Sequence, residues 1–163
     1  MHYTLIGMSG AGKSHVGKQL ATALSYEFFD IDTAMEELYQ KPLQTILLEL
    51  GDERFLIEQA ALIKETDFHI PHVIATGGSA VYTEDAMQYL KEISKVIFID
   101  VPLEMVAARI DISNRGIVGL GDKTFTQLYA ERQPLYKQWA DVTVDGDTPL
   151  QAILSHLKGN LLY

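Results

Sequence analysis

The segment GMSGAGKS, from Gly7 to Ser14, constrains the fold of this chain more than any other. It matches G-x-x-x-x-G-K-[ST], a glycine-rich loop whose backbone N–H groups surround phosphate oxygens. The apolar strand HYTLIG precedes the loop, and an amphipathic helix over 13–24 follows it, with its positive N-terminus directed at the same anion. In this context Lys13 reaches the β- and γ-phosphates, and the Ser14 hydroxyl binds Mg²⁺. The sequence therefore predicts a nucleotide-binding α/β domain.

The rest of the chain alternates between short apolar runs and amphipathic segments. We expect strands over 2–7, 27–32, 72–76, 95–101 and 141–146, and helices over 13–24, 33–39, 43–50, 51–66, 84–93, 103–110, 125–140 and 150–157. The glycine-rich segment 113–124 between two helices is predicted to be a mobile loop. Strands that alternate with helices favour a parallel sheet covered on both faces, with ligands at the carboxyl ends of the strands.

Two carboxylates follow the second predicted strand, in FFDID. Because alternate residues of a strand face the same side, Asp30 and Asp32 are both expected to face one cleft. Phosphoryl transfer needs one carboxylate that holds Mg²⁺ and another that accepts the proton of an attacking hydroxyl. The alternative is that Asp32 only caps the next helix, a common role for aspartate.

Composition limits the partners and the compartment. The net charge is −9 and the pI is about 4.9, which argues against nucleic acid and anionic membranes as partners. The 163 residues include no cysteine, which excludes disulfides and thiolate metal sites and fits a reducing cytoplasm. No apolar run is long enough to cross a bilayer, and the first residues lack the basic region of a signal peptide. We expect a single cytoplasmic domain over 1–163.

Several blocks along the whole chain together resemble shikimate kinase, a small P-loop kinase of the nucleoside monophosphate kinase type. They are GMSGAGKS, FFDIDTAME, LGDERFLIE, ATGGSAV, SNRG and ERQPLYKQWAD. The resemblance implies a three-layer α/β/α P-loop kinase fold with a five-stranded parallel sheet and a small lid over 113–124. It also implies an acceptor-binding region over 32–62, ATP and Mg²⁺ as cofactors, a monomer, and phosphorylation of the shikimate 3-hydroxyl.

The same resemblance assigns roles by position. The catalytic residues would be Lys13, Asp32 and Arg115. The nucleotide would be bound by Gly10, Ala11, Gly12, Lys13, Ser14, His15, Arg109 and Arg115. The acceptor would be bound by Asp32, Gly77, Gly78, Ser79 and Arg132, with Arg132 on its carboxylate. The metal would be held by Ser14 and Asp30.

The sequence departs from the family on the acceptor side. The family pattern G-E-x-x-F-R-x-x-E begins here as GDERFLIE, so Leu56 replaces an arginine that would bind the shikimate carboxylate beside Arg132. Arg54 lies about 200° around the helix from Leu56 and should not face the same cleft. The third glycine of the family is Ser79. These departures leave two alternatives open: a kinase of another small hydroxyl compound, such as a sugar acid or a nucleoside, or a regulatory nucleotide-binding module without kinase activity.

Overall fold

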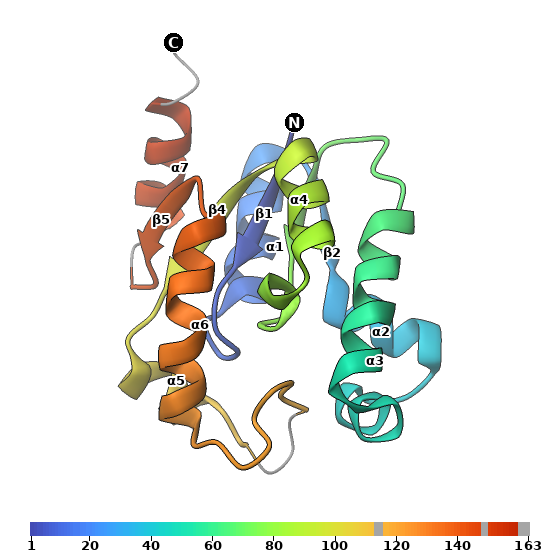
Figure 1. Cartoon of the computed structure of the whole chain (residues 1–163). Helices are drawn as coiled ribbons and strands as arrows, with labels where there is room; N and C mark the ends of the chain where they lie inside the picture. Colours follow the sequence, from blue (N-terminus) through green and yellow to red (C-terminus); the bar gives the residue numbers. More distant parts are fainter. Residues whose placement is uncertain (113–115, 148–149, 160–163) are drawn as a thin grey trace.

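The computed structural model describes residues 1–112, 116–147 and 150–159, which form a parallel sheet flanked by helices (Figure 1). The elements in chain order are β1 (His2–Ile6), α1 (Lys13–Leu24), β2 (Glu27–Asp30), α2 (Ile31–Tyr39), α3 (Leu43–Glu65), β3 (His72–Ala75), the short 3₁₀ helix η1 (Ala80–Tyr82), α4 (Glu84–Ile93), β4 (Ser94–Asp100), α5 (Leu103–Arg109), α6 (Phe125–Trp139), β5 (Val142–Asp145) and α7 (Leu150–Gly159). Within these residues no helix has the length and apolar character that a membrane span requires.

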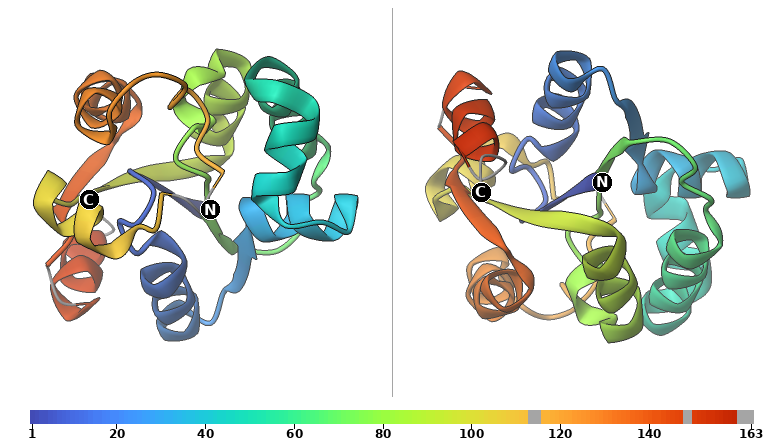
Figure 2. Two further views of the ribbon diagram at one scale, coloured as in Figure 1. Left: turned by 90° about the horizontal axis from the view of Figure 1, so that it is seen from below. Right: turned by 90° about the horizontal axis from the view of Figure 1, so that it is seen from above.

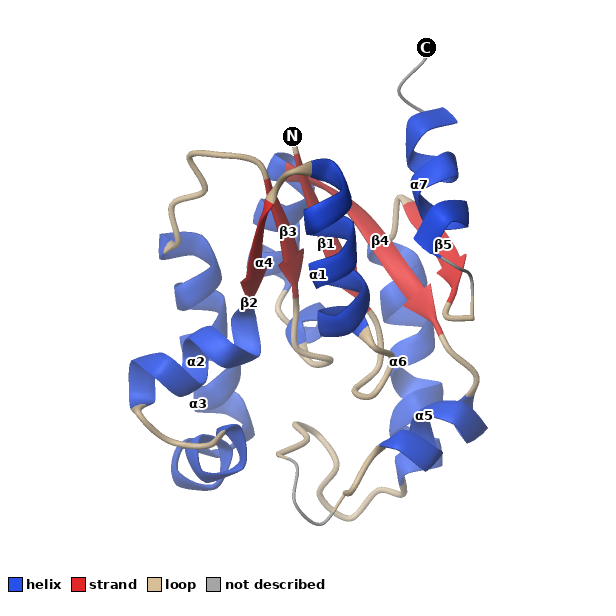
Figure 3. Ribbon diagram, turned by 180° about the vertical axis from the view of Figure 1, so that it is seen from behind, coloured by secondary structure: helices blue, strands red, loops and turns tan. Residues whose placement is uncertain are grey.

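The five strands are parallel and lie in the order β2-β3-β1-β4-β5. β1 is central, and Leu5 pairs with Ala75 of β3 on one side and Ile97 of β4 on the other. Helices α1 and α7 cover one face of the sheet, and α4 and α6 cover the other (Figures 2 and 3). This arrangement confirms the predicted three-layer α/β/α fold with a five-stranded parallel sheet.

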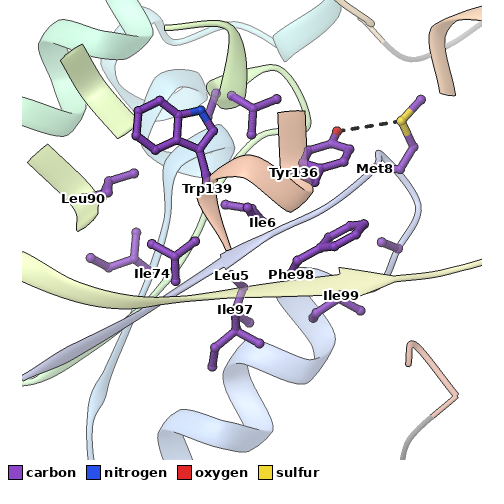
Figure 4. Close-up of a cluster of buried hydrophobic side chains, with 14 of the residues drawn as sticks. Leu5, Ile6, Met8, Ile74, Leu90, Ile97, Phe98, Ile99, Tyr136 and Trp139 are labelled. Atoms are coloured by element: carbon purple, nitrogen blue, oxygen red, sulfur yellow. Dashed lines mark hydrogen bonds between the residues drawn. The ribbon is translucent and has the colours of Figure 1, made fainter. Parts of the chain in front are cut away.

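The core lies between the sheet and its helices. Ile6 and Phe98 are buried beneath Tyr136 and Trp139 of α6 (Figure 4), whereas Leu5 is buried on the opposite face of the sheet, close to Gly17 of α1. The Tyr136 ring stacks on Phe98 at a centroid distance of 5.1 Å, and its hydroxyl donates to the Gly78 carbonyl at 2.7 Å. The interpretation of the α6 aromatics as core residues is therefore confirmed for Tyr136 and Trp139, and Tyr136 also ties α6 to the carboxyl end of β3.

The helices over 13–24 and 84–93 have the predicted bounds, whereas the predicted strand over 27–32 was too long. It ends at Asp30, because one carboxylate oxygen of Asp30 accepts hydrogen bonds from the N–H groups of Asp32 and Thr33 and starts α2. The two helices expected over 43–50 and 51–66 form one kinked element, α3. Gly51 stands at the kink with φ 75° and ψ 165°, a conformation that favours glycine.

Candidate active site

The phosphate loop joins β1 to α1 at the carboxyl end of the sheet. Lys13 is 8% exposed, and its Nζ donates to the carbonyls of Gly7 at 2.8 Å and Met8 at 2.9 Å. These contacts hold a cation on the inner side of the loop, where it can exchange carbonyl oxygens for phosphate oxygens. A pocket of about 580 Å³, here called the phosphate-loop pocket, lies against this loop. It is lined by Ser9, Gly10, Gly12, Lys13, Ser14, His15, Asp32, Thr76 and Gly78.

Of the other predicted nucleotide contacts, Ala11 is buried, and His15 is exposed on the first turn of α1, where it lines the same pocket. Arg109 at the end of α5 reaches the loop, since its Nη1 lies 3.5 Å from the Gly10 carbonyl oxygen. Arg115 lies outside the described residues. The structure thus brings the described members of the predicted nucleotide set together around one loop.

Asp30 and Asp32 are close in space, but not by the strand alternation that the sequence suggested. Asp30 ends β2, whereas Asp32 lies in the first turn of α2. Asp30, not Asp32, is the helix cap. Its other carboxylate oxygen accepts a hydrogen bond from the Ser14 hydroxyl. Both carboxylates and Ser14 line one cavity, so the helix turn brings them to the cleft that the strand was expected to form.

This group of oxygen atoms suits Mg²⁺. Mg²⁺ prefers hard oxygen ligands and binds through one or two carboxylates together with waters and phosphates. The Ser14 hydroxyl and the Asp30 carboxylate, already joined by a hydrogen bond beside the phosphate loop, are such ligands. Among the described residues no cluster of three or more histidine, cysteine or carboxylate side chains is arranged to hold a metal by itself. A metal here would therefore depend on phosphate and water for its remaining ligands.

A second pocket of about 300 Å³ adjoins the first and is here called the lid-side pocket. It is lined by Ser9, Asp32, Leu43, Phe55, Gly77, Gly78, Ser79, Gly116, Ile117, Val118 and Arg132. All the predicted acceptor-binding residues are among these. Ser9, Asp32 and Gly78 line both pockets, so the Asp32 carboxylate stands at the boundary between them.

Arg132 is the charged group of most interest in the lid-side pocket. It is only 1% exposed, and its guanidinium donates to the Val118 carbonyl at 2.5 Å and to the Tyr82 hydroxyl at 3.3 Å. It also lies over the Tyr82 ring, 5.2 Å from its centroid. Among the described residues no carboxylate is within ion-pair distance of it. A buried cation without a counter-ion is costly, and it favours an anionic ligand.

Among the described residues, no second arginine replaces the one missing at position 56. Leu56 is half-buried and packs against the apolar cluster of Met35, Ile46, Phe55 and Val118. The Arg54 side chain is 63% exposed and pairs with Glu58 at 2.6 Å. The prediction that Arg54 faces away from the cleft is therefore confirmed.

The segment expected to form a lid is described from Gly116 to Thr124 and folds over the lid-side pocket. Val118 is buried in the apolar cluster with Met35, Ile46 and Phe55. The Gly119 N–H donates to Asp52 at the kinked part of α3, at 2.8 Å. These contacts attach the segment to the helices that form the outer wall of the pocket.

Sequence reasoning missed some residues of this site. Phe55 lines the lid-side pocket, and Tyr82 contacts Arg132. Gln59 is 1% exposed, and its Nε2 has no hydrogen-bond partner among the described residues. A signal for Gln59 was available, because F-R-x-x-E counted from Phe55 places the family glutamate at position 59.

Two tyrosines beside the site have altered titration. Burial raises the pKa of Tyr136 to about 12, so this phenol stays neutral and remains a hydrogen-bond donor to the Gly78 carbonyl. Burial, and then the hydrogen bond to Glu131, also raise the pKa of Tyr82. Lys123 donates to Glu131 and lowers the pKa of that carboxyl, which stays charged next to Tyr82.

Comparison with known proteins agrees with this geometry. The family model described as "Shikimate kinase" matches residues 9–160. A shikimate kinase of Clostridium beijerinckii is 32% identical over 157 residues, which are 96% of this chain and 92% of that protein. The chain belongs to the shikimate kinase family. Its fold matches a shikimate kinase from Acinetobacter baumannii in complex with shikimate, with a TM-score of 0.89, 28% identity, and coverage of 99% of this chain and 95% of that one. The shikimate kinase from Aquifex aeolicus matches with a TM-score of 0.82 and 30% identity, over 99% of both chains.

Proposed function

We propose that this member of the shikimate kinase family transfers the γ-phosphoryl group of ATP to the 3-hydroxyl of shikimate. One observation carries the proposal: Asp32 lies between a phosphate loop and a pocket whose buried arginine has no carboxylate partner among the described residues. A hydroxyl acid in the lid-side pocket can place its carboxylate on Arg132 and its hydroxyl next to Asp32. The Acinetobacter baumannii relative, which contains shikimate, supports this choice of acceptor.

On the nucleotide side, the phosphates of ATP would bind to the loop N–H groups of Gly10, Ala11 and Gly12 and to Lys13. Ser14 and Asp30 would hold Mg²⁺, which supplies positive charge to the phosphate oxygens as the phosphoryl group moves. His15 and Arg109 would flank the nucleotide at the rim of the phosphate-loop pocket. The further role proposed for Arg115, a contact to the transferring phosphate, concerns a residue outside the described ranges.

On the acceptor side, Asp32 orients the hydroxyl and takes its proton. The hydroxyl oxygen forms a bond to the γ-phosphorus while the bond from that phosphorus to the β,γ-bridging oxygen breaks, and ADP leaves. Backbone N–H groups of Gly77 and Gly78 and the Ser79 hydroxyl would hold the acceptor beside Asp32. Water exclusion by the 113–124 lid would favour transfer to the acceptor over hydrolysis.

The proposal covers the organisation of the chain as well. The chain would act as a single kinase domain over 1–163, a monomer in the cytoplasm, with its acceptor-binding region over 32–62. Its partners would be small molecules, neither nucleic acid nor membrane. The net charge of −9 supports the exclusion of both polyanionic partners.

The experiment is ADP release from ATP·Mg²⁺ with and without shikimate, with Asp32→Asn as the inactive control. Acceptor-stimulated ADP release, with a KM for shikimate in the ordinary enzyme range of about 1 μM to 1 mM, would support the proposal. ATP binding without acceptor-stimulated ADP release would reject it and indicate a nucleotide-binding module instead.

A second candidate function rests on Leu56. With an apolar residue at this position, the described part of the lid-side pocket offers an acceptor one guanidinium rather than two. Another small hydroxyl compound, such as a sugar acid or a nucleoside, would then be the acceptor. A panel of such compounds, run on wild type and on Leu56→Arg, separates the two candidates. Shikimate turnover by Leu56→Arg alone would favour the second.

A further inference from the structure

Gln59 is a polar residue on the buried side of α3. Its buried neighbours on this helix are Phe55, Ala60 and Ile63, all apolar. Its Oε1 accepts a long hydrogen bond of 3.5 Å from the Ser79 hydroxyl, and its Nε2 has no partner among the described residues. Buried amide N–H groups are almost always hydrogen-bonded, and an unpaired one lowers stability. A donor kept at such a cost points to a partner that arrives with a ligand.

The unpaired amide lies close to Gly77, a residue that lines the lid-side pocket. A Cβ built on Gly77 would lie 2.9 Å from Gln59 Nε2 and 2.6 Å from Asp32 Oδ1. Both polar groups therefore approach the same point of the Gly77 backbone. Electrostatics favour this orientation of the Gln59 amide, because exchanging Nε2 and Oε1 would turn the carbonyl oxygen toward the Asp32 carboxylate. An N–H donor thus lies on the same side of Gly77 as the Asp32 carboxylate, which lines both pockets.

We propose that Gln59 is a specificity-determining residue of the acceptor site, whose Nε2 donates a hydrogen bond, directly or through one water, to an oxygen atom of the bound acceptor. This inference rests on the proposed function. In this proposal two groups recognise the acceptor: the charged guanidinium of Arg132 and the neutral N–H donor of Gln59. The acceptor class that fits has a single carboxylate and, next to the reacting hydroxyl, another oxygen that can accept a hydrogen bond.

The absence of a positive charge at position 56 favours a neutral side chain at position 59. Residues three apart on a helix are neighbours, so an arginine at 56 could stabilise a carboxylate at 59, as R-x-x-E provides. In this chain Leu56 packs against an apolar cluster, and a glutamate at 59 would place a buried carboxylate near the half-buried Asp32. Glutamine keeps the shape without the charge and replaces an acceptor of hydrogen bonds by a donor.

The test crosses an enzyme variant with substrate analogues. Gln59→Met keeps the volume and removes the donor, and kcat/KM is measured with shikimate and with analogues that each lack one ring hydroxyl. For shikimate we expect a loss of about ten- to a hundredfold in kcat/KM, with an unchanged KM for ATP. With one of the deoxy analogues, the one that lacks the oxygen bound by Gln59, wild type and variant should perform equally. Ile63→Met, one turn further along the buried side of α3, is the matched control and should retain kcat/KM for shikimate.

The melting temperature separates a ligand contact from a structural role. Because Nε2 has no partner among the described residues and Oε1 accepts only one long hydrogen bond, Gln59→Met should melt close to wild type. A lower melting temperature together with an equal loss of kcat/KM for every analogue would overturn the inference, as would an unchanged kcat/KM for shikimate.

Gln59→Glu, which keeps the shape but does not donate when ionised, should lose activity too, and Leu56→Arg/Gln59→Glu should recover part of it. If wild type releases no ADP with shikimate, the proposed function fails and this inference with it. If wild type is active and Gln59→Met is unaffected, only this inference fails.

Discussion

Replacing Arg132 by methionine should separate acceptor binding from folding stability. Within the described residues the guanidinium donates hydrogen bonds to the Val118 carbonyl and the Tyr82 hydroxyl. Each contributes about 1 kcal/mol net. Against this stands the desolvation of a buried cation, which costs several kcal/mol when no anion compensates it. These terms largely cancel, so we expect the free energy of unfolding of Arg132→Met to stay within about 2 kcal/mol of wild type.

The same substitution should strongly weaken acceptor binding. Removing one partner of a buried, hydrogen-bonded charge pair costs about 2–5 kcal/mol. At about 1.4 kcal/mol per factor of ten, the KM for shikimate should rise by about 30- to 4,000-fold, while the KM for ATP stays near its wild-type value. Arg132→Lys keeps the charge but not the planar guanidinium, so its KM for shikimate should lie between those of wild type and Arg132→Met.

Steady-state ADP release and scanning calorimetry measure both quantities on one preparation. For a chain of this length about 1 kcal/mol corresponds to a shift of about 2–4 °C in Tm, so Arg132→Met should melt within about 8 °C of wild type. A variant that melts far below this range while its KM for shikimate is unchanged would refute the reasoning. It would mean that Arg132 stabilises the fold and does not bind the acceptor.

Three further predictions concern other residues. Asp32→Asn should lower kcat by about 10²–10⁴ with shikimate while ATP affinity, measured by calorimetric titration, is retained. Gly77→Ala should lower kcat/KM for the acceptor, since a Cβ would stand 2.6 Å from Asp32 Oδ1, whereas its circular dichroism spectrum should match wild type. Tyr136→Phe should lower Tm by about 2–4 °C at neutral pH, because the Gly78 carbonyl loses a buried donor. The pKa of Tyr136 is about 12 in the folded protein against about 10 when unfolded, so its contribution to stability is complete below about pH 10 and is lost as the pH rises toward 12. A wild-type Tm that falls no more steeply than that of Tyr136→Phe over this range would contradict the assignment.

The architecture could be predicted from the sequence wherever a local motif is compatible with only one kind of structure. The G-x-x-x-x-G-K-S loop between an apolar strand and an amphipathic helix allows few folds, and α1 begins at Lys13 as predicted. The boundary at Asp30 was missed because an aspartate at a strand end and an aspartate cap look alike in sequence. Only the paired N–H groups of Asp32 and Thr33 distinguish them.

For the candidate site, the residue types predicted which side chains lie close together, but not which of their polar atoms lack a hydrogen-bond partner. A glutamine on a helix gives no sign in sequence of whether it faces solvent or the interior, and the absent partner of Gln59 Nε2 is a property of tertiary packing. Arg54 was different, because helical periodicity alone turned it away from the cleft. Periodicity fixes direction around a helix, whereas hydrogen-bond satisfaction depends on every neighbouring element.

The hydrogen bond from Arg132 to the Val118 carbonyl makes the protein a competitor of its own acceptor. A carboxylate that binds the Arg132 Nη2 group in place of Val118 displaces a carbonyl of the same chain, so the apparent affinity of that binding mode equals the intrinsic one multiplied by the fraction of molecules whose arginine has been released. The loop that carries Val118 is attached to α3 by the hydrogen bond from the Gly119 N–H to Asp52. A residue such as Asp52 can therefore change the KM for the acceptor without contacting it. In this chain, the contacts that attach the loop to α3 are therefore a means of adjusting the KM for the acceptor at a distance from Arg132.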